Sequence, residues 1–210
     1  MLLTVENLHK SFPERNVKAV AGVSFSLERG KTLGVIGESG SGKSTLAKLI
    51  LGLEKPDEGQ IHFHGKKMQA IFQHPTQSLN PKMRVREILS EPFLIQREHD
   101  RRLIEKKSVE LLDSVELSAQ FLSRFPRQLS GGECQRIAIA RAICLEPELI
   151  VCDEAVSSLD LLVQAGILNL LLKLQKEKSV SYLFISHDPA VVRHMSDAIL
   201  VMESGKGYNS

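Results

Sequence analysis

The chain has 210 residues, of which 42% are hydrophobic and 25% are charged, and its net charge is +2. This composition is typical of a globular protein and excludes collagen-like, mucin-like and disordered chains. The charge balance gives no indication of nucleic-acid binding. No apolar run reaches the roughly 18 residues that span a bilayer, and the first residues lack the layout of a signal peptide. We therefore expect a cytoplasmic domain whose three cysteines are buried free thiols.

The hydrophobic pattern predicts strands that alternate with helices along the chain. Strands are expected at residues 2–8, 20–27, 32–36, 60–63, 68–72, 149–152, 181–185 and 198–202. Helices are expected at residues 43–51, 101–114, 132–144, 161–176 and 190–195. Residues 75–126 are mostly helical in pattern and punctuated by proline. This order favours an α/β fold with a mostly parallel sheet, right-handed crossovers and an inserted helical subdomain.

Residues 37–44 read GESGSGKS and match the phosphate-binding pattern G-x-x-x-x-G-K-[ST] between a buried strand and a helix. The glycines let several backbone N–H groups converge on phosphate oxygens at the positive end of the helix dipole. Lys43 would place its charge on the β- and γ-phosphates, and the Ser44 hydroxyl would bind Mg²⁺. The candidate nucleotide-binding residues are Gly37, Glu38, Ser39, Gly40, Ser41, Gly42, Lys43, Ser44 and Thr45.

Two carboxylates end the apolar strand predicted at residues 149–152. A P-loop predicts a metal-binding carboxylate at such a place, and Asp153 would hold Mg²⁺ there. Glu154 would accept a proton from the water that attacks the γ-phosphate. An apolar strand ending in acids is by itself as often structural. The P-loop is what makes these two residues candidates for catalysis.

A second glycine-rich helix start lies at Ser130, Gly131 and Gly132, within the sequence LSGGE. A helix that opens on a serine and two glycines is another anion-binding N-terminus. A second phosphate site far from the P-loop makes sense if two chains face each other head to tail. Each chain would then cap the nucleotide of the other.

These motifs, in this order, resemble those of the ATP-binding-cassette (ABC) ATPases, whose signature is LSGGQ or LSGGE. The resemblance implies a P-loop core at residues 1–74 and 127–210 with an N-terminal antiparallel β subdomain, and a helical subdomain at residues 75–126. It assigns Asp160 to the D-loop and His187 to the γ-phosphate. It assigns Gln73 to Mg²⁺ and the attacking water, and Phe12 to stacking on adenine. Taken alone, Phe12 is more often a core residue and His187 a capping or surface histidine.

Residues 72–81, 85–92 and 153–166 resemble the ATPases of dipeptide, oligopeptide and nickel importers, and most of all the nickel-importer subunit. The resemblance implies a peripheral ATPase at the cytoplasmic face of the membrane. Its partners would be a second ABC ATPase subunit, two membrane permease subunits and an extracytoplasmic substrate-binding protein, with no nucleic acid. Uptake of nickel or another metal chelate is the first hypothesis, and a peptide importer is the alternative. A non-transport ABC protein ranks below both.

Two further features bear on these hypotheses. His62 and His64 share one face of a predicted strand. They could form a nickel-sensing pair, but we favour the simpler interpretation that they are two exposed histidines on an edge strand. Residues 203–210 stop where such importers usually continue into a C-terminal extension. Any function of that extension is expected to be absent, unless the chain is truncated.

Overall fold

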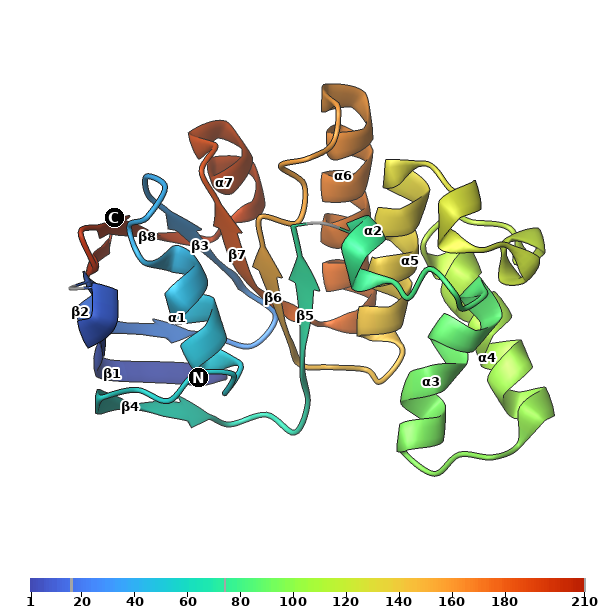
Figure 1. Cartoon of the computed structure of the whole chain (residues 1–210), viewed down its shortest axis with the longest axis horizontal. Coiled ribbons are helices and arrows are strands. Elements are labelled where there is room, and N and C mark those ends of the chain that lie inside the picture. Colours follow the sequence, from blue (N-terminus) through green and yellow to red (C-terminus); the bar gives the residue numbers. More distant parts are fainter. Residues whose placement is uncertain (16, 74, 210) are drawn as a thin grey trace. The chain divides into compact units, whose positions relative to one another are not determined.

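The computed structural model describes residues 1–15, 17–73 and 75–209, which divide into two units (Figure 1). Unit 1 comprises Met1–Ala70, Glu148–Glu154 and Ser179–Ser210, and unit 2 comprises Ile71–Pro147 and Ala155–Lys178. Unit 2 thus contains the helices of residues 75–126 together with two later ones. The prediction that residues 75–126 alone form a subdomain therefore stays a prediction.

A mostly parallel sheet has the strand order β5-β6-β7-β3-β8-β9 and belongs to unit 1 except for the last two residues of β5. The strands are β3 (Thr32–Ile36), β5 (Met68–Phe72), β6 (Leu149–Asp153), β7 (Ser181–Ser186), β8 (Ala198–Glu203) and β9 (Lys206–Asn209). Strand β3 pairs in parallel with β7 and β8, and every residue of β7 is buried. Such continuous burial is expected of a parallel strand covered on both faces. Helices α1 (Lys43–Ile50) and α7 (Pro189–Met195) belong to the same unit. The α/β class is confirmed.

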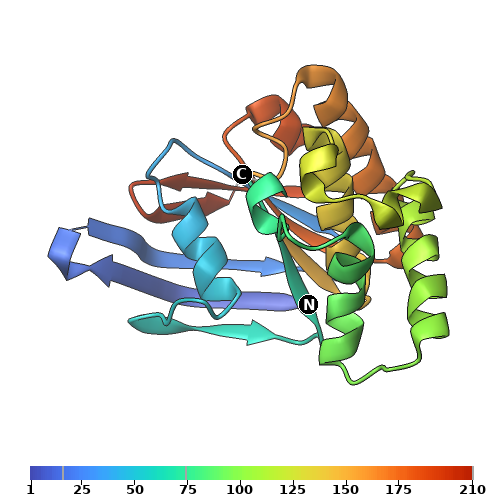
Figure 2. The same cartoon turned by 45° about the vertical axis from the view of Figure 1, so that its right-hand side comes forward.

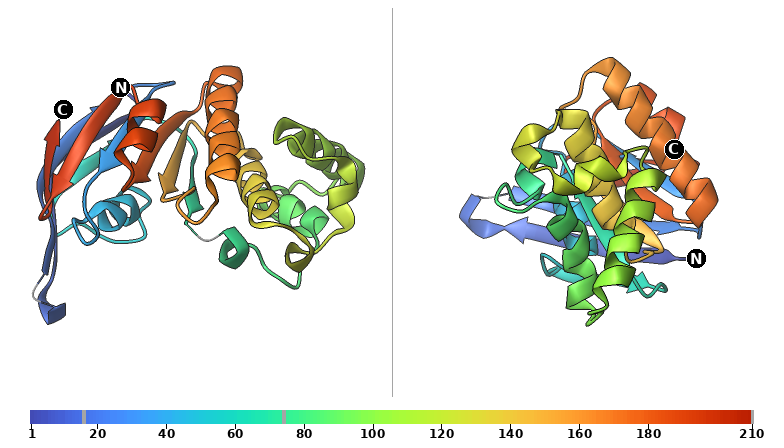
Figure 3. Two further views of the ribbon diagram at one scale, coloured as in Figure 1. Left: turned by 90° about the horizontal axis from the view of Figure 1, so that it is seen from above. Right: turned by 90° about the vertical axis from the view of Figure 1, so that its right-hand side faces the viewer.

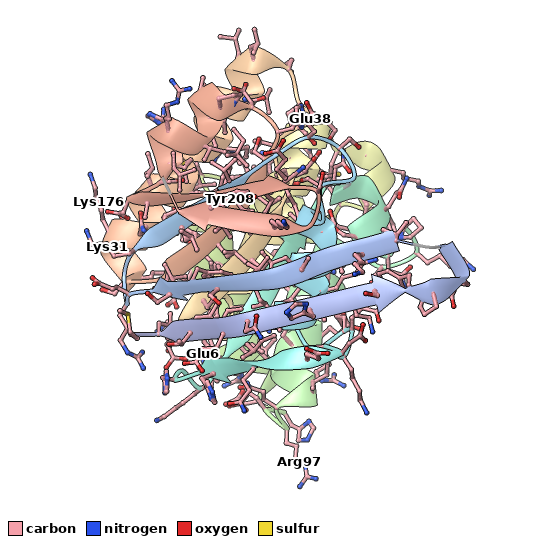
Figure 4. The ribbon with its side chains drawn as sticks, turned by 90° about the vertical axis from the view of Figure 1, so that its left-hand side faces the viewer. Glu6, Lys31, Glu38, Arg97, Lys176 and Tyr208 are labelled. Carbon is pink, nitrogen blue, oxygen red and sulfur yellow. The ribbon has the colours of Figure 1, made fainter. Side chains whose placement is uncertain are left out.

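The N-terminal strands form a separate antiparallel sheet with the order β2-β1-β4 (Figure 2). Its strands are β1 (Leu3–Phe12), β2 (Val17–Leu27) and β4 (Glu58–Phe63). One face packs into the apolar core of unit 1, whereas the other carries polar side chains such as Glu6 (Figure 4). Strand β4 lies at an edge, and His62 and His64 are exposed there, as expected.

Strand β1 runs beyond residue 8, where the sequence pattern predicted its end. It continues to Phe12, which pairs with Val17 across a short turn that includes the 3-10 helix Pro13–Arg15. Irregular register between Val5 and Leu8 explains the difference, because a bulge interrupts the alternation on which the prediction depended. Phe12 is therefore held in a hairpin rather than in a loop.

Strand β9 has no counterpart in the sequence prediction. It follows a tight turn in which Gly205 has φ = +82°, and it pairs antiparallel with β8. Its four residues include only one large apolar side chain, Tyr208, which is exposed (Figure 4). A four-residue edge strand of this kind carries no hydrophobic periodicity, so sequence reasoning could not detect it.

Unit 2 is helical. Its helices are α2 (Pro75–Ser78), α3 (Val85–Ile95), α4 (Arg101–Ser114), α5 (Gly131–Ile143) and α6 (Leu161–Lys178), with 3-10 turns at Ala119–Ser123 and Pro126–Gln128. Helices α5 and α6 lie side by side (Figure 3). Asp100 caps α4 by accepting hydrogen bonds from the N–H groups of Arg102 and Leu103. No helix in the described part of the chain is long and apolar enough to cross a membrane.

Candidate functional site

The P-loop connects β3 to α1 and can be built only with glycine at two positions. Gly42 has φ = +107°, and a Cβ atom there would lie 2.0 Å from the carbonyl oxygen of Ala19. A Cβ atom on Gly37 would lie 2.2 Å from the carbonyl oxygen of Met202. The backbone therefore approaches neighbouring strands too closely for any side chain. This close approach aims the first N–H groups of α1 at the space in front of the loop.

Lys43 is buried at the start of α1. Its Nζ donates hydrogen bonds to the carbonyl oxygens of Gly37 (2.7 Å) and Glu38 (2.8 Å). Burial lowers the pKa of Lys43 from its usual 10.5, while the charges of Glu154 and Asp153 act to raise it. The ammonium group thus closes the loop on itself and carries a positive charge where the sequence predicts phosphate binding.

A hollow of about 270 Å³ opens in front of the P-loop. It is lined by Phe12, Val17, Ala19, Ser39, Gly40, Gly42, Lys43, Ser44, Thr45 and Glu154. The lining thus combines an aromatic ring, the backbone of the P-loop, a cation and a carboxylate. These groups suit a base, a phosphate chain and a reacting water. Sequence reasoning missed Val17 and Ala19 as lining residues. The signal available for Val17 was its place opposite Phe12 in a hairpin.

The two oxygen donors proposed for Mg²⁺ meet in unit 1. Ser44 Oγ donates a hydrogen bond of 3.1 Å to Asp153 Oδ1, although 109 residues separate them in sequence. Burial raises the pKa of Asp153, and the hydrogen bond from Ser44 acts in the opposite direction. A half-buried carboxylate beside a hydroxyl is a donor set that suits Mg²⁺, which prefers oxygen ligands and would stabilise the ionised carboxylate.

Glu154 follows β6 in a left-handed backbone conformation, with φ = +51°. Its N–H donates to the carbonyl oxygen of Ile185 on β7 (3.0 Å), which holds this conformation in place. Its Oε2 lies 3.5 Å from Nδ1 of His187. Non-glycine residues in this conformation are costly and are found often at functional sites. The structure thus brings Glu154 and His187 together beside the P-loop hollow.

The remaining candidate residues belong to unit 2. Ser130 caps α5 by accepting a hydrogen bond from the N–H of Glu133 (3.2 Å), and Glu133 Oε2 accepts from the N–H of Ser130 (2.7 Å). Asp160 caps α6 through the N–H of Val163. The carbonyl oxygen of Gln73 accepts a hydrogen bond from Ser158 Oγ (3.1 Å). Each residue thus has a local structural role besides the function expected of it.

Gly131 and Gly132 open α5 and face the start of α6. A Cβ atom on Gly132 would lie 2.6 Å from Cγ1 of Val163, and one on Gly131 would lie 3.6 Å from Cδ2 of Leu159. Glycine at residue 132 is therefore required by packing within unit 2. The same absence of side chains leaves the N–H groups at this helix start uncovered.

Because the P-loop depends on glycine geometry, replacing Gly42 with alanine should disturb it strongly. We expect Gly42→Ala to lower the free energy of unfolding by about 1–3 kcal/mol more than Gly40→Ala does, since both φ angles are positive but only Gly42 lacks space for a Cβ atom. Urea unfolding of the two variants measures the difference. Equal losses would show that the approach to Ala19 is not tight.

The strand ends of the parallel sheet carry a P-loop and a paired carboxylate, and a separate helix begins with LSGGE. These features define a P-loop ATPase of the ATP-binding-cassette class. Residues 20–157 match the family model described as ABC transporter. The chain therefore belongs to the ABC transporter family, in which it is the component that hydrolyses ATP coupled to transport.

Individual relatives cover nearly the whole chain. It is 46% identical to the oligopeptide transport ATP-binding protein AppF of Bacillus subtilis, over 98% of this chain and 70% of that protein. It is 44% identical to the dipeptide transport ATP-binding protein DppF of Escherichia coli, over 92% of this chain and 63% of that protein. The chain thus spans roughly two thirds of the length of these relatives.

Solved structures support the fold assignment. The structure of cbiO1 from Clostridium perfringens, part of the ABC transporter complex cbiONQ, gives a TM-score of 0.88 at 26% identity, covering 99% of this chain and 86% of that one. The ATP-binding cassette MJ0796, in a dimeric post-hydrolysis state bound to ADP and Pi, gives a TM-score of 0.85 at 27% identity. The match covers 99% of this chain and 97% of that one.

Proposed function

We propose that the chain is the ATPase subunit of an importer for short peptides. The observation that carries this proposal is the assembly of Phe12, Lys43 and Glu154 around one hollow, beside the Ser44–Asp153 pair. The substrate class follows from relatives that are 42–46% identical and are described as oligopeptide or dipeptide transport proteins. These names favour the peptide alternative over the nickel hypothesis of the sequence analysis.

In the proposed reaction, ATP lies in the hollow with its adenine on Phe12 and its phosphates against the N–H groups of α1. Lys43 neutralises charge on the β- and γ-phosphates. When bound, Mg²⁺ would be held by Ser44 and Asp153 and would supply electrostatic stabilisation of the phosphates. A role for Gln73, which belongs to unit 2, stays a prediction of the family resemblance. Glu154 accepts a proton from the attacking water, and His187 lies beside Glu154 to orient the reacting groups.

The residues of unit 2 would act on the nucleotide of a second ATPase subunit. Ser130, Gly131 and Gly132 present a helix N-terminus suited to phosphate, and Asp160 lies at the start of α6. A head-to-tail pair of ATPase subunits would use both sites together. The dimeric structure of MJ0796 is a precedent for pairing in a cassette of this fold.

The proposed contact with the permease is a groove of about 990 Å³ on unit 2, between α3 and α4. Its lining includes Met83, Arg86, Leu94, Ile95 and Ile104. The side chains of Leu94 and Ile95 are 48% and 75% exposed, which is unusual for large apolar residues and fits a surface covered by a partner. Binding there would place the subunit at the cytoplasmic face of the membrane, together with two permeases and an extracytoplasmic substrate-binding protein.

Uptake in cells tests the substrate class. A strain that lacks the gene, complemented with the wild-type chain or with Lys43→Met, is given a labelled dipeptide and labelled nickel. We expect only the wild-type chain to restore peptide uptake, with nickel uptake unchanged throughout. Loss and rescue of nickel uptake alone would return the assignment to nickel. If neither uptake depends on the gene, a transporter for these substrates is ruled out.

A further inference from the structure

Five basic residues of unit 2 lie at or just before the start of α3 and in the segment before α5, and we call them the basic patch: Lys82, Arg84, Arg86, Arg124 and Arg127. We propose that this basic patch binds the phosphate headgroups of anionic lipids beside the permease. The proposal rests on the proposed function for its location next to a membrane protein. Its test, however, uses lipid vesicles without any permease, so the two can fail independently.

The basic patch is built where the start of α3 packs on the segment before α5 (Figure 1). The N–H of Val85 donates to the carbonyl oxygen of Arg124 (2.9 Å), which joins the two segments. Arg84 Nη1 donates to the carbonyl oxygen of Ser123 (3.1 Å), and Arg86 Nε donates to that of Leu122 (3.5 Å). The guanidinium groups of Arg84 and Arg86 are therefore held in position while other N–H groups of each remain available.

Two of these arginines share one aromatic ring. The Cζ atoms of Arg84 and Arg127 lie 4.9 Å and 5.5 Å from the ring centroid of Phe125, and Cζ of Arg124 lies 4.4 Å from that of Phe121. Cation–π attraction holds each guanidinium group near its ring. Two positive charges are thereby held at one ring, where a bound anion would lower their mutual repulsion.

Acidic side chains lie near one end of the basic patch, because Glu87, Glu91 and Glu105 line the same groove as Arg86. Within the described chain, none of its five cations makes an ion pair. Glu87 is near in sequence, but its Oε2 accepts a hydrogen bond from the backbone N–H of Arg84 (2.5 Å). Four of the five side chains are exposed and Arg124 is half-buried. Fixed, exposed guanidinium groups are suited to phosphate, which they can bind through paired hydrogen bonds.

The position of the basic patch favours lipid as the source of phosphate. Arg86 belongs both to the patch and to the groove proposed for the permease. Met83 of that groove lies between Lys82 and Arg84, and Leu122 lies two residues before Arg124. A subunit docked under a membrane protein lies next to the negatively charged headgroups of the cytoplasmic leaflet. Clusters of four to eight Lys or Arg residues are the usual means of binding such a surface.

Vesicle co-sedimentation of the full chain tests the proposal. We expect binding to vesicles containing phosphatidylglycerol, no binding to phosphatidylcholine vesicles, and loss of binding at high salt. The triple variant Lys82→Gln, Arg124→Gln and Arg127→Gln should bind roughly 100-fold more weakly, because each cation near such a surface contributes about a fivefold change in affinity. Its basal ATPase activity should be unchanged.

The matched control removes three positive charges from α4, as Arg101→Gln, Arg102→Gln and Lys106→Gln. Equal weakening in this control would overturn the proposal, since net charge rather than the basic patch would then explain binding. The proposal would also be overturned if the chain bound poly-glutamate but not phosphatidylglycerol vesicles. That result would favour an acidic protein as the partner of the basic patch. If millimolar inorganic phosphate abolished vesicle binding while NaCl of the same ionic strength did not, free phosphate would be the preferred ligand and the lipid proposal would be overturned. If the triple variant fails to fold, the single variant Lys82→Gln and the salt titration of the wild-type chain test the proposal instead. Unchanged vesicle binding in both would overturn it.

Discussion

Replacing Glu154 with glutamine should lower kcat for ATP hydrolysis by about 10²–10⁴-fold, since a general base contributes an effect of that size. The amide keeps the shape of the side chain but cannot accept a proton. The left-handed backbone of Glu154 and its N–H bond to Ile185 do not involve the carboxylate, so the site should keep its geometry. The Kd for MgATP should stay within about threefold. Steady-state ATPase assays and displacement of a fluorescent ATP analogue by MgATP measure the two quantities.

A matched control is Glu177→Gln, which makes the same chemical change at an exposed position near the end of α6. Its turnover should equal that of the wild-type chain. If kcat of the Glu154→Gln variant fell by less than tenfold, Glu154 would not be the base. His187, which lies 3.5 Å from it, would then be the next residue to test.

Lys43→Met should weaken MgATP binding by about 10- to 100-fold and abolish measurable hydrolysis. A charge-assisted hydrogen bond contributes about 1.5–3 kcal/mol, and Lys43 is the P-loop cation that lines the hollow. Methionine fills a similar volume but leaves the carbonyl oxygens of Gly37 and Glu38 without their donor. The same substitution should therefore also lower the free energy of unfolding. Isothermal titration and urea unfolding measure the two effects.

Lys48→Met is the control on the same helix, because Lys48 is exposed and does not line the hollow. It should change nucleotide binding by less than threefold. Wild-type affinity in Lys43→Met would mean that the backbone N–H groups of α1 bind the phosphates without help from the lysine.

Local patterns were enough to establish most of the chemistry of this chain. The P-loop could be recognised because phosphate binding imposes glycines, a lysine and a hydroxyl at fixed spacings between a strand and a helix. The strands expected at residues 32–36 and 181–185 were predictable because both faces of a parallel strand are covered and its central residues are mostly apolar. Asp153 and Glu154 followed from their place at the end of such a strand.

Tertiary structure alone decided which of these residues meet. The 3.1 Å contact of Ser44 with Asp153 depends on the strand order, which no local pattern encodes. Three other features likewise depend on long-range packing. They are the bulged hairpin that carries Phe12 to the P-loop hollow, the edge strand β9, and the contact of both Arg84 and Arg127 with the ring of Phe125. The sequence by itself determined the chemical groups and the elements that carry them, because those follow from neighbouring residues. The distances between these groups, and the surfaces that they form together, depend on how the whole chain packs. Only the folded structure decided them.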